Sequence, residues 1–276
     1  MNDFINPERI EDILVNCVRR SSEFVMAEPH FHSYYEFYYL ISGQCKMFIR
    51  QDLYYLRPGD MIIIRPGEIH KSLYEKDWNA ERFMAYFTQE YVDAFQNSCG
   101  RAAFDHMLSS PRVSVPLAYQ ATADSLFRQM VAEDSRSDAF SAIQLKSALY
   151  QLLVILGRCR GTGERRENLE EAENAVMEAA RYIYEHHREN VTLEQAADAA
   201  YMSPTYFSKK FKSVTGFGFK EYLNSIRLRE AEDMLKNTGL GITEIALSCG
   251  FSDGNYFGDV FKKAKGVPPR QYRKLS

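Results

Sequence analysis

Cysteine is scarce in this 276-residue chain, which holds five scattered cysteines and no C-x-x-C pair. This excludes zinc-finger chemistry and a disulfide framework, and it favours a reducing compartment, the cytoplasm. Long apolar runs are also lacking. The longest notable one, from Leu152 to Leu156, is far too short for a membrane span. The polar, acidic start MNDFINPERIED does not read as a signal peptide, so we expect no membrane partner.

A strong basic excess is missing as well, because the formal net charge is −3. That value argues against a nonspecific nucleic-acid binder. The charge is unevenly distributed, however, since the residues from Thr192 onward sum to +4 and the remainder to −7. A basic end after an acidic body is typical of a separate DNA-binding domain.

Three regions of the chain differ in their pattern. Residues from about 24 to 90 contain β-branched and aromatic runs such as FYYLI and MIII, with turn signals about every 8–12 residues, which predicts a β-sandwich or barrel. Helical periodicity follows, and five leucines between residues 145 and 156 fall on one face. The charged stretch RGTGERRENLEE is interpreted as a linker. The predicted domains are therefore 1–160 and 173–276, with the linker at 161–172.

The last third of the chain contains an internal repeat. Two pairs are offset by 49 residues and four later pairs by 50, so one residue is inserted around Asp253–Asn255. The pairs are Ala197 with Ala246, Ser203 with Ser252, Phe207 with Phe257, Phe211 with Phe261, Gly216 with Gly266 and Tyr222 with Tyr272.

Each copy is expected to fold as a helix-turn-helix, over about 193–213 and 242–263. In the first copy Ser203 is a good N-cap and Pro204 suits the first helical position, where its missing N–H costs nothing. Phe207 and Phe211 lie four residues apart and should face the core. Gly216 suits the left-handed conformation of a C-cap.

With both phenylalanines inward, Thr205, Ser208, Lys209 and Lys212 face outward. Hydroxyl and ammonium groups near a helix N-terminus suit base edges and phosphates in a major groove. The alternative is an ordinary solvated helical face. The duplication favours DNA, because two such units joined by a helix from Phe219 to Leu235 could enter successive major-groove segments.

This last third resembles the AraC/XylS family of transcription regulators over about 100 residues. The matching segments are SPTYFSKKFK, IRLREAEDML, ITEIALSCGFSD and NYFGDVFKKAKGVPPRQYR. The resemblance implies a double helix-turn-helix domain that binds double-stranded DNA. It places DNA contacts on the outward residues of both second helices, which here are Ser203, Thr205, Ser208, Lys209, Lys212, Gly254, Asn255, Asp259, Lys262 and Lys263.

The second unit departs from the family pattern at Gly258 and Asp259, where a small polar and a basic residue are usual. Glycine weakens a helix by about 1 kcal/mol. Asp259 repels phosphate but could accept from a cytosine amino group. Arg227 and Arg229 are either a phosphate-contacting pair or a structural pair bridging to acidic neighbours, and Tyr272 and Arg273 are expected to close the core.

The strand-rich region contains H-x-H-x3-E-x6-G followed by G-x7-G-x2-H, which resembles the two cupin motifs. Arg65 replaces the usual proline of the second motif. The resemblance implies a small β-barrel whose His30, His32, Glu36 and His70 converge. Three imidazoles and a carboxylate suit a divalent metal. The alternative is a metal-free effector pocket, lined by the same residues and by Tyr38, in which tyrosines would suit a sugar. No cofactor is certain.

These observations predict an α+β multidomain protein: a cupin-like effector barrel with a helical dimerisation segment, and an all-α DNA-binding domain. The expected function is sequence-specific transcription regulation modulated by a small metabolite, with RNA polymerase and a second copy as further partners and no catalysis. A metal enzyme with an appended DNA module, and a constitutive DNA-binding protein whose barrel only dimerises it, are the competing hypotheses. For the leucine face, a dimer contact and packing on its own barrel are both open.

Overall fold

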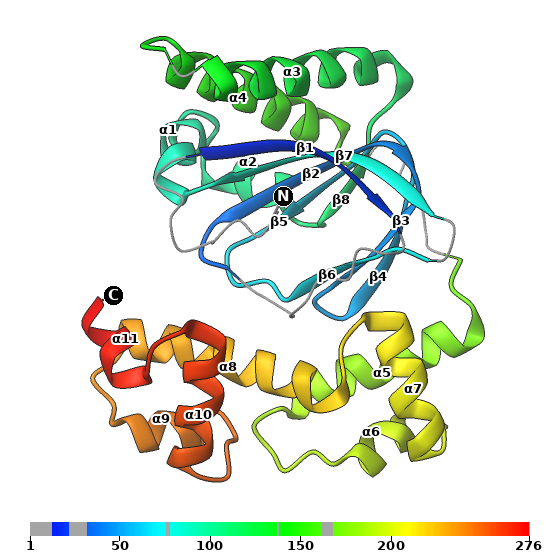
Figure 1. The fold of residues 1–276 in the computed structure, drawn as a ribbon, viewed down its shortest axis with the longest axis vertical. Helices are drawn as coiled ribbons and strands as arrows, with labels where there is room; N and C mark the ends of the chain where they lie inside the picture. The colour runs from blue at the N-terminus through cyan, green and yellow to red at the C-terminus, as the bar shows by residue number, and fades with distance from the viewer. Residues whose placement is uncertain (1–12, 22–31, 76–77, 137, 162–167, 276) are drawn as a thin grey trace. The chain divides into compact units, whose positions relative to one another are not determined.

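The computed structural model describes residues 13–21, 32–75, 78–136, 138–161 and 168–275 (Figure 1). The chain divides close to residue 168 into two compact units, and each is described by itself. None of the helices within the described ranges has the length and apolar character needed to cross a membrane.

The N-terminal unit contains two sheets. One has five strands in the order β1-β7-β2-β5-β8, and the other has three in the order β4-β3-β6. The pairs β1–β7, β7–β2, β2–β5, β5–β8 and β3–β6 are antiparallel. The strands are β1 (Ile13–Ser21), β2 (Tyr35–Gly43), β3 (Cys45–Ile49), β4 (Asp52–Leu56), β5 (Asp60–Ile64), β6 (His70–Leu73), β7 (Asn79–Phe87) and β8 (Arg112–Ser114).

The five-stranded sheet has two buried faces. On β7, Phe83, Ala85 and Phe87 pack with the helices of the unit, whereas Ala80 and Met84 face the three-stranded sheet. Successive strand residues point to opposite faces. We call the space between the two sheets the barrel interior.

Four helices cover the outer face of this sheet: α1 (Gln89–Cys99), α2 (Arg101–Met107), α3 (Leu117–Arg136) and α4 (Ser141–Cys159) (Figure 1). All five leucines of the predicted face lie on α4 and are buried in the core of their own unit. Packing on their own sheet is therefore the correct alternative, and these leucines are not available for a dimer contact.

The C-terminal unit is entirely helical. Its helices are α5 (Glu171–His186), α6 (Leu193–Ala199), α7 (Pro204–Thr215), α8 (Phe219–Asn237), α9 (Ile242–Ser248), α10 (Gly254–Lys265) and α11 (Pro269–Leu275). Figure 1 shows α7 and α10 near opposite ends of the long helix α8. The predicted combination of a β-rich first part and a helical second part is confirmed.

Two strands lie outside the predicted strand region. β1 begins at Ile13 rather than near residue 24, and β8 follows the first two helices. β1 is an edge strand in which Arg19 and Cys17 are exposed. Its sequence ILVNCVRRS mixes polar and apolar residues, so its pairing with β7 decides its structure more than its own hydrophobicity does.

Candidate functional site

The first candidate surface is the outer face of α7. Phe207 and Phe211 are fully buried, as the periodicity predicts. Pro204 opens the helix, and Gly216 ends it with a left-handed φ of 78°. Ser203 is at the N-cap position, but its hydroxyl makes no capping hydrogen bond. The five outward residues predicted for this unit are all exposed: Ser203, Thr205, Ser208, Lys209 and Lys212.

The outer face of α10 is the second candidate surface. Phe257 and Phe261 are buried, and Gly266 ends the helix with a φ of 75°. Asn255, Asp259, Lys262 and Lys263 are exposed, whereas Gly254 and Gly258 are half-buried. A Cβ on Gly254 would lie 3.3 Å from Thr243 Oγ1, so this glycine lies against α9 and adds little to the exposed face.

The N-cap of α10 is Asp253, whose carboxylate accepts from the N–H groups of Asn255 and Tyr256. The two turns otherwise match at an offset of 49, because Met202 N donates to Ala197 O as Phe251 N donates to Ala246 O. The inserted residue therefore lies at Ser252–Asp253, slightly earlier than predicted. Asp253, and not Ser252, is therefore the positional equivalent of Ser203 at the N-cap.

Sequence reasoning missed three exposed tyrosines on these surfaces. Tyr201 in the first turn is 98% exposed, and Tyr206 and Tyr256 occupy matching positions on α7 and α10. Tyr206 and Tyr256 are 50 positions apart, which is the offset of the repeat, so the repeat could have revealed that they are equivalent. Tyr256 Oη accepts a hydrogen bond of 3.0 Å from Asn224 of α8.

The barrel interior contains the second predicted constellation. His32, Glu36 and His70 are buried, and both imidazole Nε2 atoms meet the same carboxylate oxygen, Glu36 Oε2, at 3.2 and 3.1 Å. Their ligand atoms lie within 4.8 Å of one another. His30 lies outside the described residues, and Tyr38 is fully buried beside this cluster on β2.

Hydrogen bonding defines the tautomers of the two rings. His32 Nδ1 lies 2.8 Å from Tyr34 O, and His70 Nδ1 lies 2.9 Å from Glu68 O. A carbonyl only accepts, so each Nδ1 carries the proton. A neutral ring then presents a bare Nε2 lone pair to the carboxylate, a repulsive arrangement that a proton or a metal cation between the two atoms would relieve. Outward Nδ1–H groups held by carbonyls are also typical of metal-ligating histidines.

Electrostatics within the cluster follow from burial and pairing. Burial opposes ionisation of Glu36, but His70 and His32 hold its pKa well below the usual value. Burial also opposes charge on His70, yet Glu36 raises its pKa. For His32 burial dominates and lowers the pKa. The favoured state is a Glu36 carboxylate paired with a His70 imidazolium.

Comparisons with known proteins identify both units of the chain. Residues 18–153 match the model described as "AraC-like ligand binding domain", and residues 196–275 match the model described as "Helix-turn-helix domain". The chain belongs to the AraC family. The two matches cover most of the barrel with its helices and most of the C-terminal unit.

Individual relatives of this AraC-family chain cover different shares of it. It is 38% identical over 121 residues to the uncharacterized HTH-type transcriptional regulator YijO of Escherichia coli K12, spanning 44% of this chain and 43% of YijO. It is 26% identical to the HTH-type transcriptional activator RhaS of Enterobacter sp. strain 638, spanning 88% of this chain and 86% of RhaS. The C-terminal domain of AraT, a response regulator from Geobacillus stearothermophilus, is 37% identical over 39% of this chain and 89% of that domain, with a TM-score of 0.37. The chain thus spans less than half the length of YijO.

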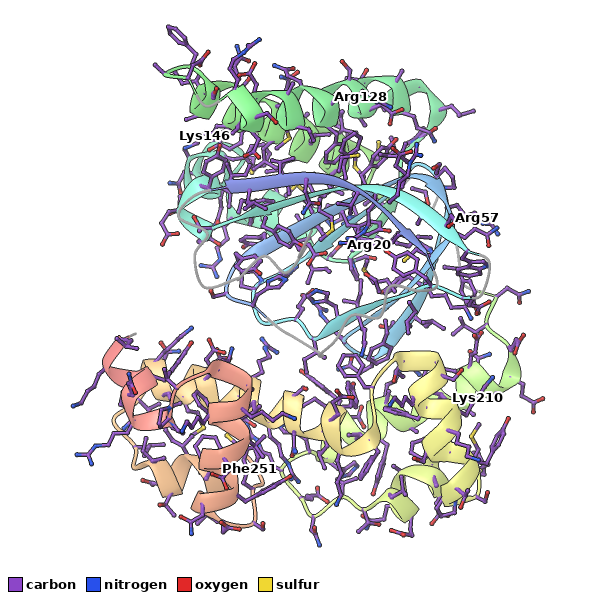
Figure 2. All side chains as sticks on the ribbon, viewed as in Figure 1. Arg20, Arg57, Arg128, Lys146, Lys210 and Phe251 are labelled. Atoms are coloured by element: carbon purple, nitrogen blue, oxygen red, sulfur yellow. The ribbon has the colours of Figure 1, made fainter. Side chains whose placement is uncertain are left out.

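Helix α8 of this AraC-family chain is held by buried polar contacts. Arg227 donates from Nε to His187 O at 2.7 Å and from a terminal nitrogen to Glu189 O at 2.8 Å, just beyond the C-terminal end of α5. Its guanidinium lies 5.8 Å from the ring of Phe251, a buried residue labelled in Figure 2. Arg227 is therefore structural, through carbonyls rather than through the acidic neighbours considered in the sequence.

Glu232 on the same helix joins three elements. Its carboxylate contacts Lys236 Nζ at 2.7 Å, Lys265 Nζ of α10 at 2.6 Å and Tyr272 Oη of α11 at 2.5 Å. Arg273 donates to Leu240 O at 2.7 Å. Tyr272 and Arg273 thus close the end of the domain, as the sequence predicted.

Proposed function

We propose that this chain is a sequence-specific DNA-binding transcription regulator. The observation that carries the proposal is the pair of equivalent exposed helices, α7 and α10, at the two ends of α8. Helix α8 has 19 residues and is about 28 Å long at 1.5 Å per residue. Successive major-groove segments lie about 34 Å apart along DNA, so two helices spaced by α8 suit adjacent segments.

The proposed roles follow from side-chain chemistry. Thr205, Ser208 and Lys209 would contact base edges, and Lys212, Lys262 and Lys263 would contact phosphates. On α10 Asn255 is well suited to an adenine, while Asp259 suits only a donor such as the cytosine amino group. We therefore assign most of the base specificity to α7, which has Ser203 at its N-terminus. The role of Gly254 is to allow α10 to pack closely.

The test is selection of bound fragments from a random-sequence DNA pool by the full chain at fixed salt. The Thr205→Ala/Lys209→Ala variant should lose the selected sequence at the positions contacted by α7. The matched control Ser98→Ala/Arg101→Ala removes the same kinds of group from exposed positions near α1 and α2 and should select the wild-type sequence. Selection of the same sequence by both variants would contradict the proposed role of α7.

We further propose that the barrel interior binds a small effector, with a sugar-like molecule as the starting hypothesis. His32, Glu36, Tyr38 and His70 would contact it, and His30 remains part of the predicted set. Regulation requires that the effector bind one state of the protein more tightly than another. The proposal also includes binding to a second copy of the chain and to RNA polymerase, and a location in the cytoplasm. It gives the barrel no catalytic role.

A divalent metal in the barrel is the second candidate, favoured by the two Nε2 atoms that meet one carboxylate oxygen. His32, Glu36 and His70 would hold it, and a metal would supply an open coordination position for an effector oxygen. Elemental analysis of the purified chain should find a stoichiometric metal that His70→Gln loses. If the wild-type chain and His70→Gln contain equally little metal after dialysis against zinc, the cluster is an internal ion pair.

A further inference from the structure

A charged residue that the sequence did not single out lies in the barrel interior. Arg82 is on β7, between Ala80 and Met84, which both face the interior, and it is only 3% exposed. Strand alternation therefore directs its side chain between the two sheets. A guanidinium stays protonated at every physiological pH, so the interior contains a permanent positive charge.

No carboxylate within the described ranges lies within 4.0 Å of this guanidinium. Its contacts are Met84 Sδ, to which one terminal nitrogen is directed, and the ring of Tyr38, whose centre is 5.3 Å from Arg82 Cζ. Arg82 Nε is buried and has no hydrogen-bond partner. The Glu36 carboxylate is nearby, but it is already hydrogen-bonded to His32 and His70.

Tyr38 adds a second unsatisfied group to the same place. Its side chain is fully buried, and its hydroxyl makes no hydrogen bond of good geometry, although the Cys45 thiol and the Tyr74 hydroxyl are close enough to interact with it. A buried guanidinium without a carboxylate and a buried hydroxyl without a well-formed hydrogen bond are both costly. Two such groups side by side indicate a partner that is not part of the polypeptide.

We propose that Arg82 and Tyr38 bind an anionic group of the effector, a carboxylate or a phosphate. A guanidinium donates two parallel hydrogen bonds to either group, and the phenol hydroxyl adds a third donor. The effector is thus an acid or a phosphate ester rather than a neutral sugar. This inference rests on the proposed role of the barrel as an effector site.

The test measures thermal unfolding of the full chain with simple probes at constant ionic strength. Acetate and inorganic phosphate at about 50 mM represent the two anion types, and acetamide is the neutral counterpart of acetate. At least one anion should raise the melting temperature of the wild-type protein by about 3–5 °C, while acetamide should not. The anion with the larger shift distinguishes a carboxylate from a phosphate ligand.

Three variants make the test specific. Arg82→Met keeps much of the volume, removes the charge and should abolish the anion-dependent shift, and Tyr38→Phe should reduce it. Arg57→Met is the matched control, because Arg57 is exposed and its side chain points away from the barrel in Figure 2. Its shift should equal that of the wild-type protein.

Without anion, Arg82→Met should unfold at a higher temperature than the wild-type protein, since it removes a buried charge that lacks a carboxylate partner. Equal shifts in wild type and Arg82→Met, or no shift with either anion, would overturn the proposal. The measurement uses no DNA. Its failure therefore leaves the DNA-binding proposal intact, and failure of the DNA selection would not alter an anion-dependent shift.

Discussion

Tyr201 and Gly250 occupy the same left-handed position in the two helix-turn-helix units, with φ values of 54° and 87°. The surroundings decide which residue is tolerated. A Cβ at Gly250 would lie 2.6 Å from His187 O and 2.7 Å from Arg188 Cα, whereas the Tyr201 side chain is almost fully solvent-exposed. The glycine is thus required by packing, and the tyrosine only costs backbone strain.

Substitutions at these two positions should change stability in opposite directions. Gly250→Ala should lower the free energy of unfolding by about 2–3 kcal/mol, from backbone strain and the close approach to α5. Tyr201→Gly should raise it by about 0.5–1 kcal/mol, because the left-handed strain disappears. Urea unfolding of the full chain measures both, and a loss of stability in Tyr201→Gly would show that the exposed ring makes stabilising contacts.

Single residues differ in how well the sequence predicts them. The outward residues of α7 follow from the four-residue spacing of Phe207 and Phe211, and the meeting of His32, Glu36 and His70 follows from the cupin-like spacing. Arg82 was missed because ERFMAYF reads as an apolar strand with charges at its start. Only the register of β7 against β1 and β2 shows that this arginine faces inward.

At the scale of elements, α8 is held at two points along its length by different chemistry. Arg227 in its middle reaches the carbonyls beyond α5, while Glu232 near its C-terminal end joins α10 and α11. The helix boundaries in this domain could be predicted from caps and periodicity. The partners of Arg227 could not, because backbone carbonyls 38 and 40 residues away leave no mark on the local sequence.

Removing the Arg227 guanidinium should destabilise the C-terminal unit. Arg227→Met leaves two carbonyls beyond α5 without their donors, which should cost about 2–3 kcal/mol. Arg229→Met is the control: Arg229 is half-buried two residues further along α8, and the expected cost is below about 1 kcal/mol. Chemical denaturation would contradict this assignment if the two variants were destabilised equally.

The Glu232 cluster predicts a pH dependence. Burial alone would raise the pKa of Glu232, but Lys265 and Lys236 together with Tyr272 hold it below its usual value. A carboxylate with a lowered pKa contributes stability above its unfolded pKa and loses it as pH falls through the folded value. Burial and Glu232 also raise the pKa of Tyr272 to about 12, so the phenol stays a donor at neutral pH.

Glu232→Gln should therefore have a free energy of unfolding about 2 kcal/mol below that of the wild-type protein at pH 7, and this difference should shrink as the pH is lowered from 7 to 3. Urea titrations of both proteins at each pH provide the measurement. A constant difference between the two proteins across this range would show that the carboxylate charge contributes nothing.

At the scale of the whole molecule, the division into a β-rich and a helical unit was predictable, because the hydrophobic period changes along the sequence. The edge strand β1 was not, since the residues of β7 with which it pairs lie 58 to 74 positions later. The exposed lysines also act at the scale of the whole molecule, because both α7 and α10 contribute them. Their positive charges are attracted to DNA phosphates whatever the base sequence.

Replacing Lys262 and Lys263 with alanine should weaken binding to every DNA sequence by a similar factor. The slope of log affinity against log salt concentration should fall by about 0.9 for each phosphate that the variant no longer neutralises. Fluorescence anisotropy over a salt series compares this variant with Thr205→Ala/Lys209→Ala, which should also change sequence preference. An unchanged slope would place α10 away from the phosphates.

The Arg82 guanidinium, which has no carboxylate partner in the described part of the chain, has a consequence for the lifetime of the protein in a cell. A fold that contains an uncompensated buried charge opens more often, and intracellular proteases degrade opened chains. A bound anion would close this route by mass action. We therefore expect the number of copies per cell to rise with the concentration of the effector, so that turnover and transcriptional response would report the same metabolite.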